Sequence, residues 1–204
     1  MSLQRTASGA RTRQRILEAA EHLMRTMGLA RVTTKEIARA AGLSEAALYR
    51  HFSGKEELFV AVLQERLPAL GSLIAELADD PGDRTAEECL GDIARNATLF
   101  YEKSLPIGAS LFAEPALLQR HREGLRKLGA GPHMPLEALA GFLRTLRADG
   151  RIRADADPES AAALLLGACY QRAFLRHFMG EDGSPKSTDE FAAGLARTVL
   201  RGIA

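Results

Sequence analysis

The sequence predicts an all-α fold of about nine or ten helices. Apolar residues recur three and four positions apart along most of the 204-residue chain, which is the spacing that gives a helix one buried face. No segment alternates β-branched and polar residues as a half-buried strand does. Capping residues and Gly or Pro breakers divide the chain into segments of helical length.

The first helix is expected over about residues 16–27. One face carries Ile16, Ala20, Leu23 and Met27, with Leu17 and Met24 beside them. Gly28 is a natural residue to end the helix, and Leu29 is expected to fold back on Met24 as in a Schellman motif.

Side-chain caps predict the next two helices. Thr33 and Glu36 form a capping box that opens a second helix, which stops at Gly42. Ser44 caps a third, short helix. The inward residues of this third helix are Leu48 and Phe52.

The remaining helices are expected from similar signals. Ser53 and Glu56 form a second capping box for a fourth helix, which Pro68 bends or ends before it resumes to about Ala78. Helical patterns follow over about residues 84–101, 111–128, 135–148, 158–179 and 187–202. Breaks are expected near residues 79–83, 106–108, 129–132, 149–150 and 180–185. The segment 158–179 is apolar on all sides through 161–170, which predicts burial on more than one face.

The composition excludes several classes of protein. With 46% hydrophobic and 26% charged residues, the chain is typical of a folded globular protein. Its longest strictly apolar run, 161–166, is far shorter than the roughly 20 residues that span a bilayer, and no signal peptide is evident at the N-terminus. Cys89 and Cys169 are too far apart to indicate a disulfide framework or a metal site. We therefore expect a cytoplasmic protein without membrane contact, metal or cofactor.

Positive charge is concentrated at the N-terminal end. Residues 1–55 contain ten Lys and Arg against four Glu, a net charge of +6, which leaves −5 on residues 56–204. This asymmetry indicates a polyanion-binding part joined to a body with another role. We therefore expect two domains, 1–55 and 56–204.

The most informative stretch is 33–58, which has the pattern of a helix-turn-helix. A capped helix, a tight turn at 42–44 and a short second helix follow one another. The leading end of the short helix is slim enough for a major groove about 12 Å wide. The Tyr49 hydroxyl, the His51 imidazole and the Lys55 ammonium are placed where they can reach the DNA backbone on either side of the groove.

This stretch closely resembles the DNA-binding segment of the tetracycline-repressor (TetR) family. The resemblance is carried by the Ala41-Gly42 turn, Leu48-Tyr49-x-His51-Phe52 and Lys55-Glu56-x-Leu58. It covers roughly residues 12–60, and beyond them only length and helix order agree. The resemblance implies an N-terminal three-helix DNA-binding domain and a C-terminal helical domain for ligand binding and dimerisation.

Carried onto this sequence, the resemblance implies two kinds of DNA contact. Candidate base readers are Lys35, Glu45, Ala46 and Ala47. Candidate phosphate contacts are Thr33, Thr34, Ser44, Tyr49, His51 and Lys55. Thr33 and Ser44 would also serve as caps in any protein. Packing in a generic helical protein is the alternative for Tyr49 and His51, but their joint spacing argues against it. Glu45 departs from the pattern, since an acid accepts from cytosine N4 but repels phosphate.

Four arginines precede the motif, at positions 5, 11, 13 and 15. On a flexible arm, Arg5, Arg11, Arg13 and Arg15 would reach the minor groove or neighbouring phosphates. Disordered, solvated charge explains them equally well.

The resemblance also implies a homodimer on a palindromic double-stranded operator. By order and length, segments 136–148 and 158–179 match the helix pair that dimerises in the family. Small residues that would let a partner helix approach are Ala161, Ala162, Ala163, Gly167 and Ala168.

A small-molecule effector cavity is expected in the C-terminal body. Residues that would line it are Phe100, Tyr101, Phe112, Met134, Phe142, Tyr170 and Phe174. Polar contacts would come from His133, Arg172 and His177, although exposed surface explains these residues equally well. Core packing is the competing explanation for each aromatic residue. An apolar lining suits a small lipophilic or aromatic effector.

The sequence thus favours a ligand-responsive transcriptional regulator, most simply a repressor. A small helical enzyme is the first alternative, although no nucleotide-binding loop, nucleophile elbow or zinc motif occurs. A helical adaptor that does not bind DNA is the second alternative. It explains the helices but not the concentration of positive charge around the helix-turn-helix.

Overall fold

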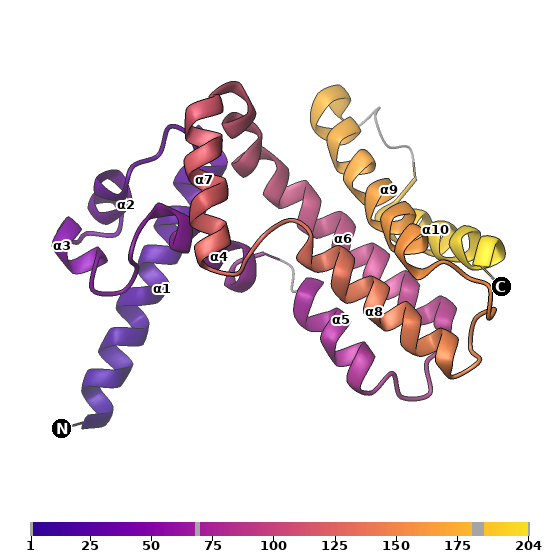
Figure 1. Cartoon of the computed structure of the whole chain (residues 1–204). Helices are drawn as coiled ribbons and strands as arrows, with labels where there is room; N and C mark the ends of the chain where they lie inside the picture. Colours follow the sequence, from indigo (N-terminus) through magenta and orange to yellow (C-terminus); the bar gives the residue numbers. More distant parts are fainter. Residues whose placement is uncertain (1, 68–69, 181–185, 204) are drawn as a thin grey trace. The chain divides into compact units, whose positions relative to one another are not determined.

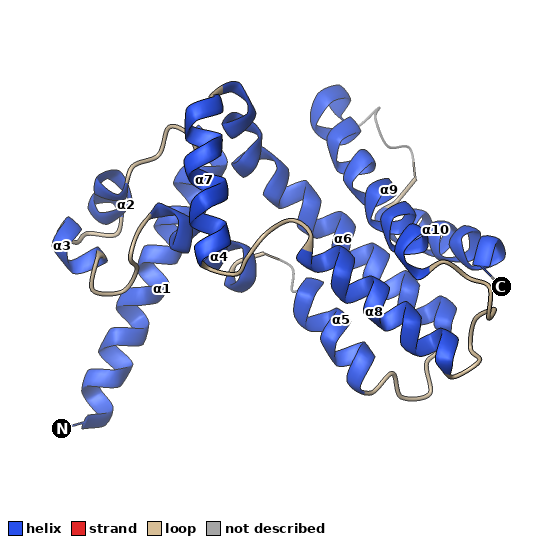
Figure 2. Ribbon diagram, in the orientation of Figure 1, coloured by secondary structure: helices blue, strands red, loops and turns tan. Residues whose placement is uncertain are grey.

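The computed structural model describes residues 2–67, 70–180 and 186–203. These residues form ten α-helices and one 3₁₀ turn and contain no strand, so the all-α prediction is confirmed (Figure 2). The elements are α1 (Ser2–Met27), α2 (Thr34–Ala40), α3 (Glu45–Leu48), α4 (Lys55–Glu65), α5 (Leu70–Asp79), α6 (Ala86–Ala109), η1 (Ser110–Ala113), α7 (Pro115–Lys127), α8 (Met134–Ala148), α9 (Pro158–Met179) and α10 (Thr188–Ile203). Pro68 and most of the predicted 180–185 break lie outside the described residues.

The chain packs as two compact units (Figure 1). The first comprises Met1–Leu67 and Lys103–Gly131, and the second comprises Pro68–Glu102 and Pro132–Ala204. Helix α6 contributes its first turns to the second unit and its last turns to the first. The functional division expected at residue 55 stays a prediction.

In the first unit, α1 packs against α2 and α4, and α4 packs against α7. The face of α1 that is fully buried carries Ile16, Leu17, Ala20 and Met24. Met27, which was predicted to belong to the buried stripe, is 37% exposed. The buried face of α1 is therefore shifted around the helix toward Leu17 and Met24, because both α2 and α4 pack against α1.

The flexible arm predicted before residue 16 is wrong. Helix α1 begins at Ser2, and two of the arginines assigned to the arm bind within the first unit. Arg13 donates from Nη2 to Glu65 Oε1 at 2.7 Å, and its guanidinium lies 5.0 Å from the centre of the Phe52 ring. Arg15 donates to the carbonyl oxygen of Ala41.

The end of α1 also differs from the prediction. Gly28 takes φ +79° and donates to the Met24 carbonyl at 3.0 Å, which closes the helix. A Schellman motif would turn the Leu29 N–H back onto α1, but this N–H donates to the Ile107 carbonyl at 2.8 Å. The turn after α1 is therefore tied to the end of α6.

The caps of α2 and α3 are confirmed, whereas the predicted cap of α4 is displaced by one residue. Helix α4 begins at Lys55 after Gly54, so the third helical position is Glu57 rather than Glu56. The N–H and the hydroxyl of Ser53 donate to Glu57 Oε2 at 2.6 and 2.7 Å. Hydrogen bonding to Ser53 lowers the pKa of the Glu57 carboxyl.

The break predicted near 106–108 is absent, and α6 continues through Pro106 to Ala109. Proline inside a helix removes the N–H that serves the carbonyl four residues earlier, which here belongs to Glu102. That carbonyl instead has the His177 imidazole as its partner, with Nε2 at 2.7 Å. A contact distant in sequence thus supplies the missing hydrogen bond.

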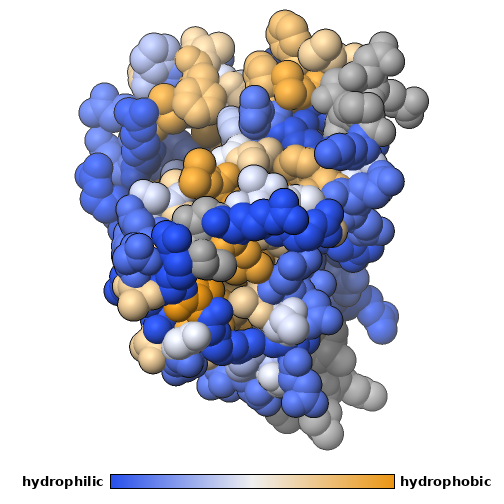
Figure 3. All heavy atoms as spheres, turned by 90° about the vertical axis from the view of Figure 1, so that its right-hand side faces the viewer, coloured by the Kyte–Doolittle hydropathy of each residue, from blue (hydrophilic) through white to orange (hydrophobic). Residues whose placement is uncertain are grey.

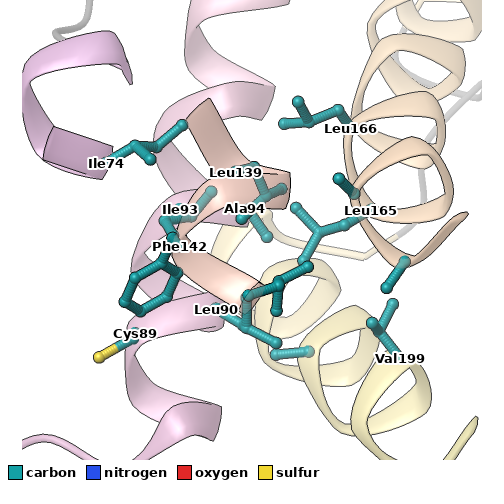
Figure 4. Packing of buried hydrophobic residues seen from close by; sticks show 14 of the residues in the cluster. Ile74, Cys89, Leu90, Ile93, Ala94, Leu139, Phe142, Leu165, Leu166 and Val199 are labelled. Atoms are coloured by element: carbon teal, nitrogen blue, oxygen red, sulfur yellow. The ribbon is translucent and has the colours of Figure 1, made fainter. Parts of the chain in front are cut away.

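The second unit has its core between α5, α6, α8, α9 and α10. Buried side chains from these helices meet around Leu90, Ile93, Phe142 and Leu165 (Figure 4). Helix α8 contacts both α5 and α9, and its buried apolar residues pack in the core of the second unit. The dimerising pair expected at 136–148 and 158–179 stays a prediction.

Helix α9 is buried on one side and open on the other. Asp157 caps it and Pro158 begins it, as predicted. Leu165, Leu166 and Cys169 are buried, whereas Leu164 is 66% and Phe178 79% exposed. Figure 3 views the molecule from the side on which α9 and α10 lie in Figure 1, and exposed apolar side chains lie there among polar ones. The predicted burial on more than one face is therefore not met within one chain.

Among the described helices, no single one is long and apolar enough to cross a membrane; α4 and α5 reach that length only together, across a break.

Candidate DNA-binding surface

The helix-turn-helix is built by α2, a tight turn and α3. Thr33 caps α2 by accepting from the Glu36 N–H, and Glu36 accepts in return from the Thr33 N–H at 2.9 Å. Ser44 caps α3 by accepting from the Ala47 N–H at 3.2 Å. Two local signals in the sequence therefore fix where both helices begin.

The turn between the helices depends on Gly42, which has φ +67°. The Leu43 N–H donates to the Ala38 carbonyl at 2.9 Å. A Cβ at position 42 would lie 2.9 Å from Nη2 of Arg15, which holds the adjacent Ala41 carbonyl. Arg15 thus braces the turn from α1, a role that the sequence pattern did not indicate.

The inner face of the motif joins it to the first unit. Leu48 and Phe52 are 0% and 2% exposed, as predicted. Ala47 is 8% exposed, so the structure does not bring it to the outer surface with the other candidate base readers. The outer surface therefore carries Lys35, Glu45 and Ala46 of that set.

Most of the candidate phosphate contacts lie on this outer surface. Thr33, Ser44 and Tyr49 are exposed, and Thr34 and His51 are partly exposed. Exposed arginines that the sequence interpretation left unassigned are Arg39, at the end of α2, and Arg50, after α3. Positive charge and hydroxyl groups are therefore exposed on α2, on the cap of α3 and directly after α3.

Lys55 differs from the other candidates. Its ammonium donates to the carbonyl oxygens of Leu29 at 3.0 Å and Val32 at 3.2 Å. Burial lowers the pKa of the Lys55 ammonium. The structure thus gives this side chain a bracing role that competes with the predicted phosphate contact, which stays a prediction.

Three residues of the motif form a connected polar group. The Thr34 hydroxyl lies 2.7 Å from Glu45 Oε1 and 3.2 Å from the Tyr49 hydroxyl. Thr34 begins α2, whereas Glu45 begins α3 and Tyr49 follows it. Spacing in the sequence gives no signal for this contact between the two helices.

The predicted effector residues are only partly brought together. In the second unit, the Tyr101 ring lies 5.4 Å from Phe100 and 5.5 Å from Tyr170, centre to centre. Phe142 is 2% exposed and belongs to the core, while Met134 and Phe174 are 43% and 46% exposed. Phe112 belongs to the first unit and is 72% exposed. The cavity stays a prediction.

The polar residues assigned to that cavity have other partners or are exposed. The Arg172 guanidinium lies 4.8 Å from the Phe191 ring centre and donates to the Lys186 carbonyl at 2.7 Å. His177 contacts Glu102, and His133 is exposed. A surface hollow of about 460 Å³ in the second unit is lined by charged residues near 76–88 and includes none of the predicted effector residues.

The cysteines are structural. Cys89 and Cys169 are both buried and unpaired. The Cys169 thiol donates to the Ala94 carbonyl at 3.4 Å, and burial raises its pKa to about 11. Such a thiol stays protonated at neutral pH and is a poor nucleophile.

Two capped helices, a glycine turn and an outer surface of cations and hydroxyls define a helix-turn-helix DNA-binding protein. Residues 16–62 match the family described as bacterial regulatory proteins, tetR family, and residues 124–201 match the AefR-like transcriptional repressor C-terminal domain. The chain belongs to the TetR family of transcriptional regulators.

Relatives agree with this assignment. An uncharacterised helix-turn-helix regulator of Bacillus subtilis, YvkB, is 29% identical over 153 residues, which are 74% of this chain and 75% of that protein. The nucleoid occlusion factor SlmA of Vibrio campbellii is 42% identical over 72 residues, which span only 35% of this chain and 37% of that protein.

Solved structures share the fold over nearly the whole chain. A TetR-family regulator of Mesorhizobium loti has a TM-score of 0.69 at 22% identity and covers 96% of this chain and 98% of its own. NalD of Pseudomonas aeruginosa, the secondary repressor of a multidrug efflux pump, has a TM-score of 0.65 at 25% identity and covers 97% of each chain. FadR of B. subtilis, solved with stearoyl-CoA, has a TM-score of 0.65 at 18% identity and covers 94% of this chain and 99% of its own.

Proposed function

We propose that the chain is a homodimeric repressor that acts in the cytoplasm and binds a palindromic operator through the outer surface of α2 and α3. The observation that carries the proposal is the set of exposed cations and hydroxyls around α3. Lys35 and Ala46 are exposed and Glu45 is partly exposed, and we assign these side chains to the base edges. Thr33 and Ser44 are exposed and His51 is partly exposed, and we assign these side chains to phosphates of the two strands.

The dimer is supported by α9. Its open side exposes Leu164, Phe174 and Phe178, and the rings of Phe174 and Phe178 stack at 5.6 Å. An apolar helix face of this kind is suited to a second copy of itself across a two-fold axis. Two recognition helices related by that axis would read a palindrome with half-sites one helical turn apart, about 34–36 Å.

The effector is proposed to be a small lipophilic or aromatic molecule that binds the second unit. The ring cluster of Phe100, Tyr101 and Tyr170 supports this choice. Structural neighbours include the transcriptional regulator FadR in complex with stearoyl-CoA and a repressor of a multidrug efflux pump. An effector lowers operator affinity only if it binds the DNA-free conformation more tightly.

Selection of bound duplexes from a random DNA pool, followed by anisotropy titration, tests the proposal. We expect a palindromic sequence to be enriched, and its log K to fall linearly with log salt, because binding releases counterions from the phosphates. Lys35→Ala should relax the base preference, at a cost of about 1–3 kcal/mol per bidentate contact. Absence of binding to any duplex at low salt would favour a helical adaptor. An apolar ligand that saturates the second unit but leaves operator affinity unchanged would contradict the effector role.

A further inference from the structure

The polar group of Thr34, Glu45 and Tyr49 joins the two helices of the motif on its outer surface. Thr34 Oγ1 lies 2.7 Å from Glu45 Oε1 and 3.2 Å from Tyr49 Oη. Glu45 and Thr34 are partly buried, whereas Tyr49 is 49% exposed. The group is therefore in contact with solvent and would be in contact with DNA bound to this surface.

The protons in this group can be assigned from its chemistry. A carboxylate only accepts hydrogen bonds, and a threonine hydroxyl has a single proton to donate. Thr34 therefore donates to Glu45. The contact between Thr34 and Tyr49 then requires Tyr49 to be the donor and the Thr34 oxygen to be the acceptor. The chain of bonds runs from Tyr49 through Thr34 to Glu45.

This assignment conflicts with simple phosphate binding. Phosphate oxygens only accept hydrogen bonds, so a hydroxyl binds phosphate by donating its proton. Thr34 and Tyr49 were both predicted to bind phosphate, yet in this arrangement each proton is already donated inside the protein. As long as Thr34 donates to Glu45, neither the Thr34 hydroxyl nor the Tyr49 hydroxyl has a proton left to donate to a phosphate.

We propose that Glu45 is a specificity gate, which holds the Thr34 and Tyr49 hydroxyls away from the DNA backbone until its carboxylate finds a base amino group. The inference rests on the proposed function, because it assumes that this surface binds DNA. In the major groove the amino groups are cytosine N4 and adenine N6. On a cognate half-site, Glu45 exchanges Thr34 for such a base, and both hydroxyls turn to phosphate.

On other sequences this exchange is unfavourable. If Glu45 stays on Thr34, the two phosphate contacts are not made. If it leaves Thr34, a carboxylate is left without a donor close to phosphates, at the cost of both desolvation and repulsion. Glu45 therefore lowers affinity for non-cognate DNA more than for the operator, which makes an acidic residue at this position a device for specificity.

The test compares Glu45→Ala with Glu45→Gln on a random-sequence duplex and on the selected operator. Glutamine removes the charge, but its amide oxygen still accepts from Thr34. We expect Glu45→Ala to raise non-specific affinity about tenfold, the equivalent of one charge-assisted hydrogen bond, and to reduce the ratio of operator to non-specific affinity. Glu45→Gln should raise non-specific affinity less. Thermal unfolding of each variant checks that it is folded.

Thr34→Val separates the gate from simple charge repulsion. In the wild-type protein it should change non-specific affinity less than about twofold, because the Thr34 hydroxyl is not on phosphate. The two consequences of its removal, a free Tyr49 hydroxyl and a Glu45 carboxylate without its donor, act in opposite directions on affinity. In Glu45→Ala it should lower affinity about fivefold or more, since the freed hydroxyl binds phosphate. Tyr49→Phe should follow the same pattern. If Glu45→Ala fails to fold, the single variants still decide the test, because a loss of more than about twofold from Tyr49→Phe or Thr34→Val in the wild type would overturn the gate.

Two outcomes distinguish a failure of the proposed DNA-binding function from a failure of the gate. If the wild-type protein and all variants bind no duplex at low salt, the proposed function is wrong and the gate falls with it. If DNA binds but the effects of Glu45→Ala and Thr34→Val are additive, the DNA-binding function stands and the gate is wrong.

Discussion

His177 Nε2 lies 2.7 Å from the carbonyl oxygen of Glu102, the carbonyl in α6 that Pro106 has no N–H to serve. A carbonyl only accepts, so Nε2 carries the proton. The neighbouring Arg176 holds the side chain of the same residue, with Nη1 3.5 Å from Glu102 Oε1. The last turn of α9 therefore completes α6 at its proline and allows this helix to continue.

His177→Ala should destabilise the protein by about 0.5–1.5 kcal/mol, because it replaces an exposed hydrogen bond to the Glu102 carbonyl by a bond to water. In a Pro106→Ala background the cost should fall close to zero, since the substituted alanine supplies a backbone N–H to that carbonyl. Urea unfolding of the four proteins measures this coupling. An equal cost of His177→Ala in both backgrounds would show that the imidazole does not replace the missing helical bond.

Gly28→Ala should destabilise the first unit by about 2–4 kcal/mol, combining a left-handed backbone with overpacking. Gly28 has φ +79°, and a Cβ there would lie 2.6 Å from Ser110 Oγ. Ser110 Oγ accepts from the Ala30 N–H at 3.0 Å, so it is not free to move away. Chemical denaturation measures the loss.

Gly129→Ala is the matched control for Gly28→Ala. Gly129 has φ +60° but nothing within 4 Å of a Cβ, so its substitution should cost only the backbone term, about 1–2 kcal/mol. Equal losses at the two glycines would mean that the contact with Ser110 has no energetic weight.

Lys55→Met should destabilise the first unit by about 1–3 kcal/mol and leave the salt dependence of DNA binding unchanged. The ammonium is held by the Leu29 and Val32 carbonyls, and their loss of a charged donor carries the cost. Lys35→Met is the control, because Lys35 is exposed and its removal should change stability by less than about 0.5 kcal/mol. A slope flattened by about 0.9 per subunit without loss of stability would instead establish Lys55 as a phosphate contact.

The sequence predicted those parts of the fold that depend on neighbours in the chain. Thr33 with Glu36, and Asp157 with Pro158, cap their helices as expected, because a cap is formed within four residues. Leu48 is buried as predicted, since helical spacing determines which face is apolar.

Contacts between distant segments could not be predicted in this way. The partners of Arg13 and Arg15 lie 52 and 26 residues away, so their charge alone suggested a DNA-binding arm. A helix break was predicted at Pro106, because nothing near it in the sequence reveals that His177 hydrogen-bonds to the Glu102 carbonyl, which has lost its helical partner. The contact of Thr34 with Glu45 likewise exists only once α2 and α3 have folded together.

Phe178→Glu should convert the dimer into a monomer. Phe178 is 79% exposed beside Phe174 on the open side of α9, and in a two-fold dimer each charge would be buried against an apolar partner without a counter-ion. Phe112→Glu is the control, because Phe112 is 72% exposed but lies in η1, away from α9 in the sequence and in the other unit. Sedimentation velocity at micromolar concentration should show the wild type and Phe112→Glu as dimers and Phe178→Glu as a monomer.

The monomer should keep its affinity for random-sequence DNA per subunit but lose most of its preference for the operator, because only a dimer engages both half-sites at once. A wild-type protein that sediments as a monomer would contradict the dimer, and Phe178→Glu that remains dimeric would move the interface off this part of α9.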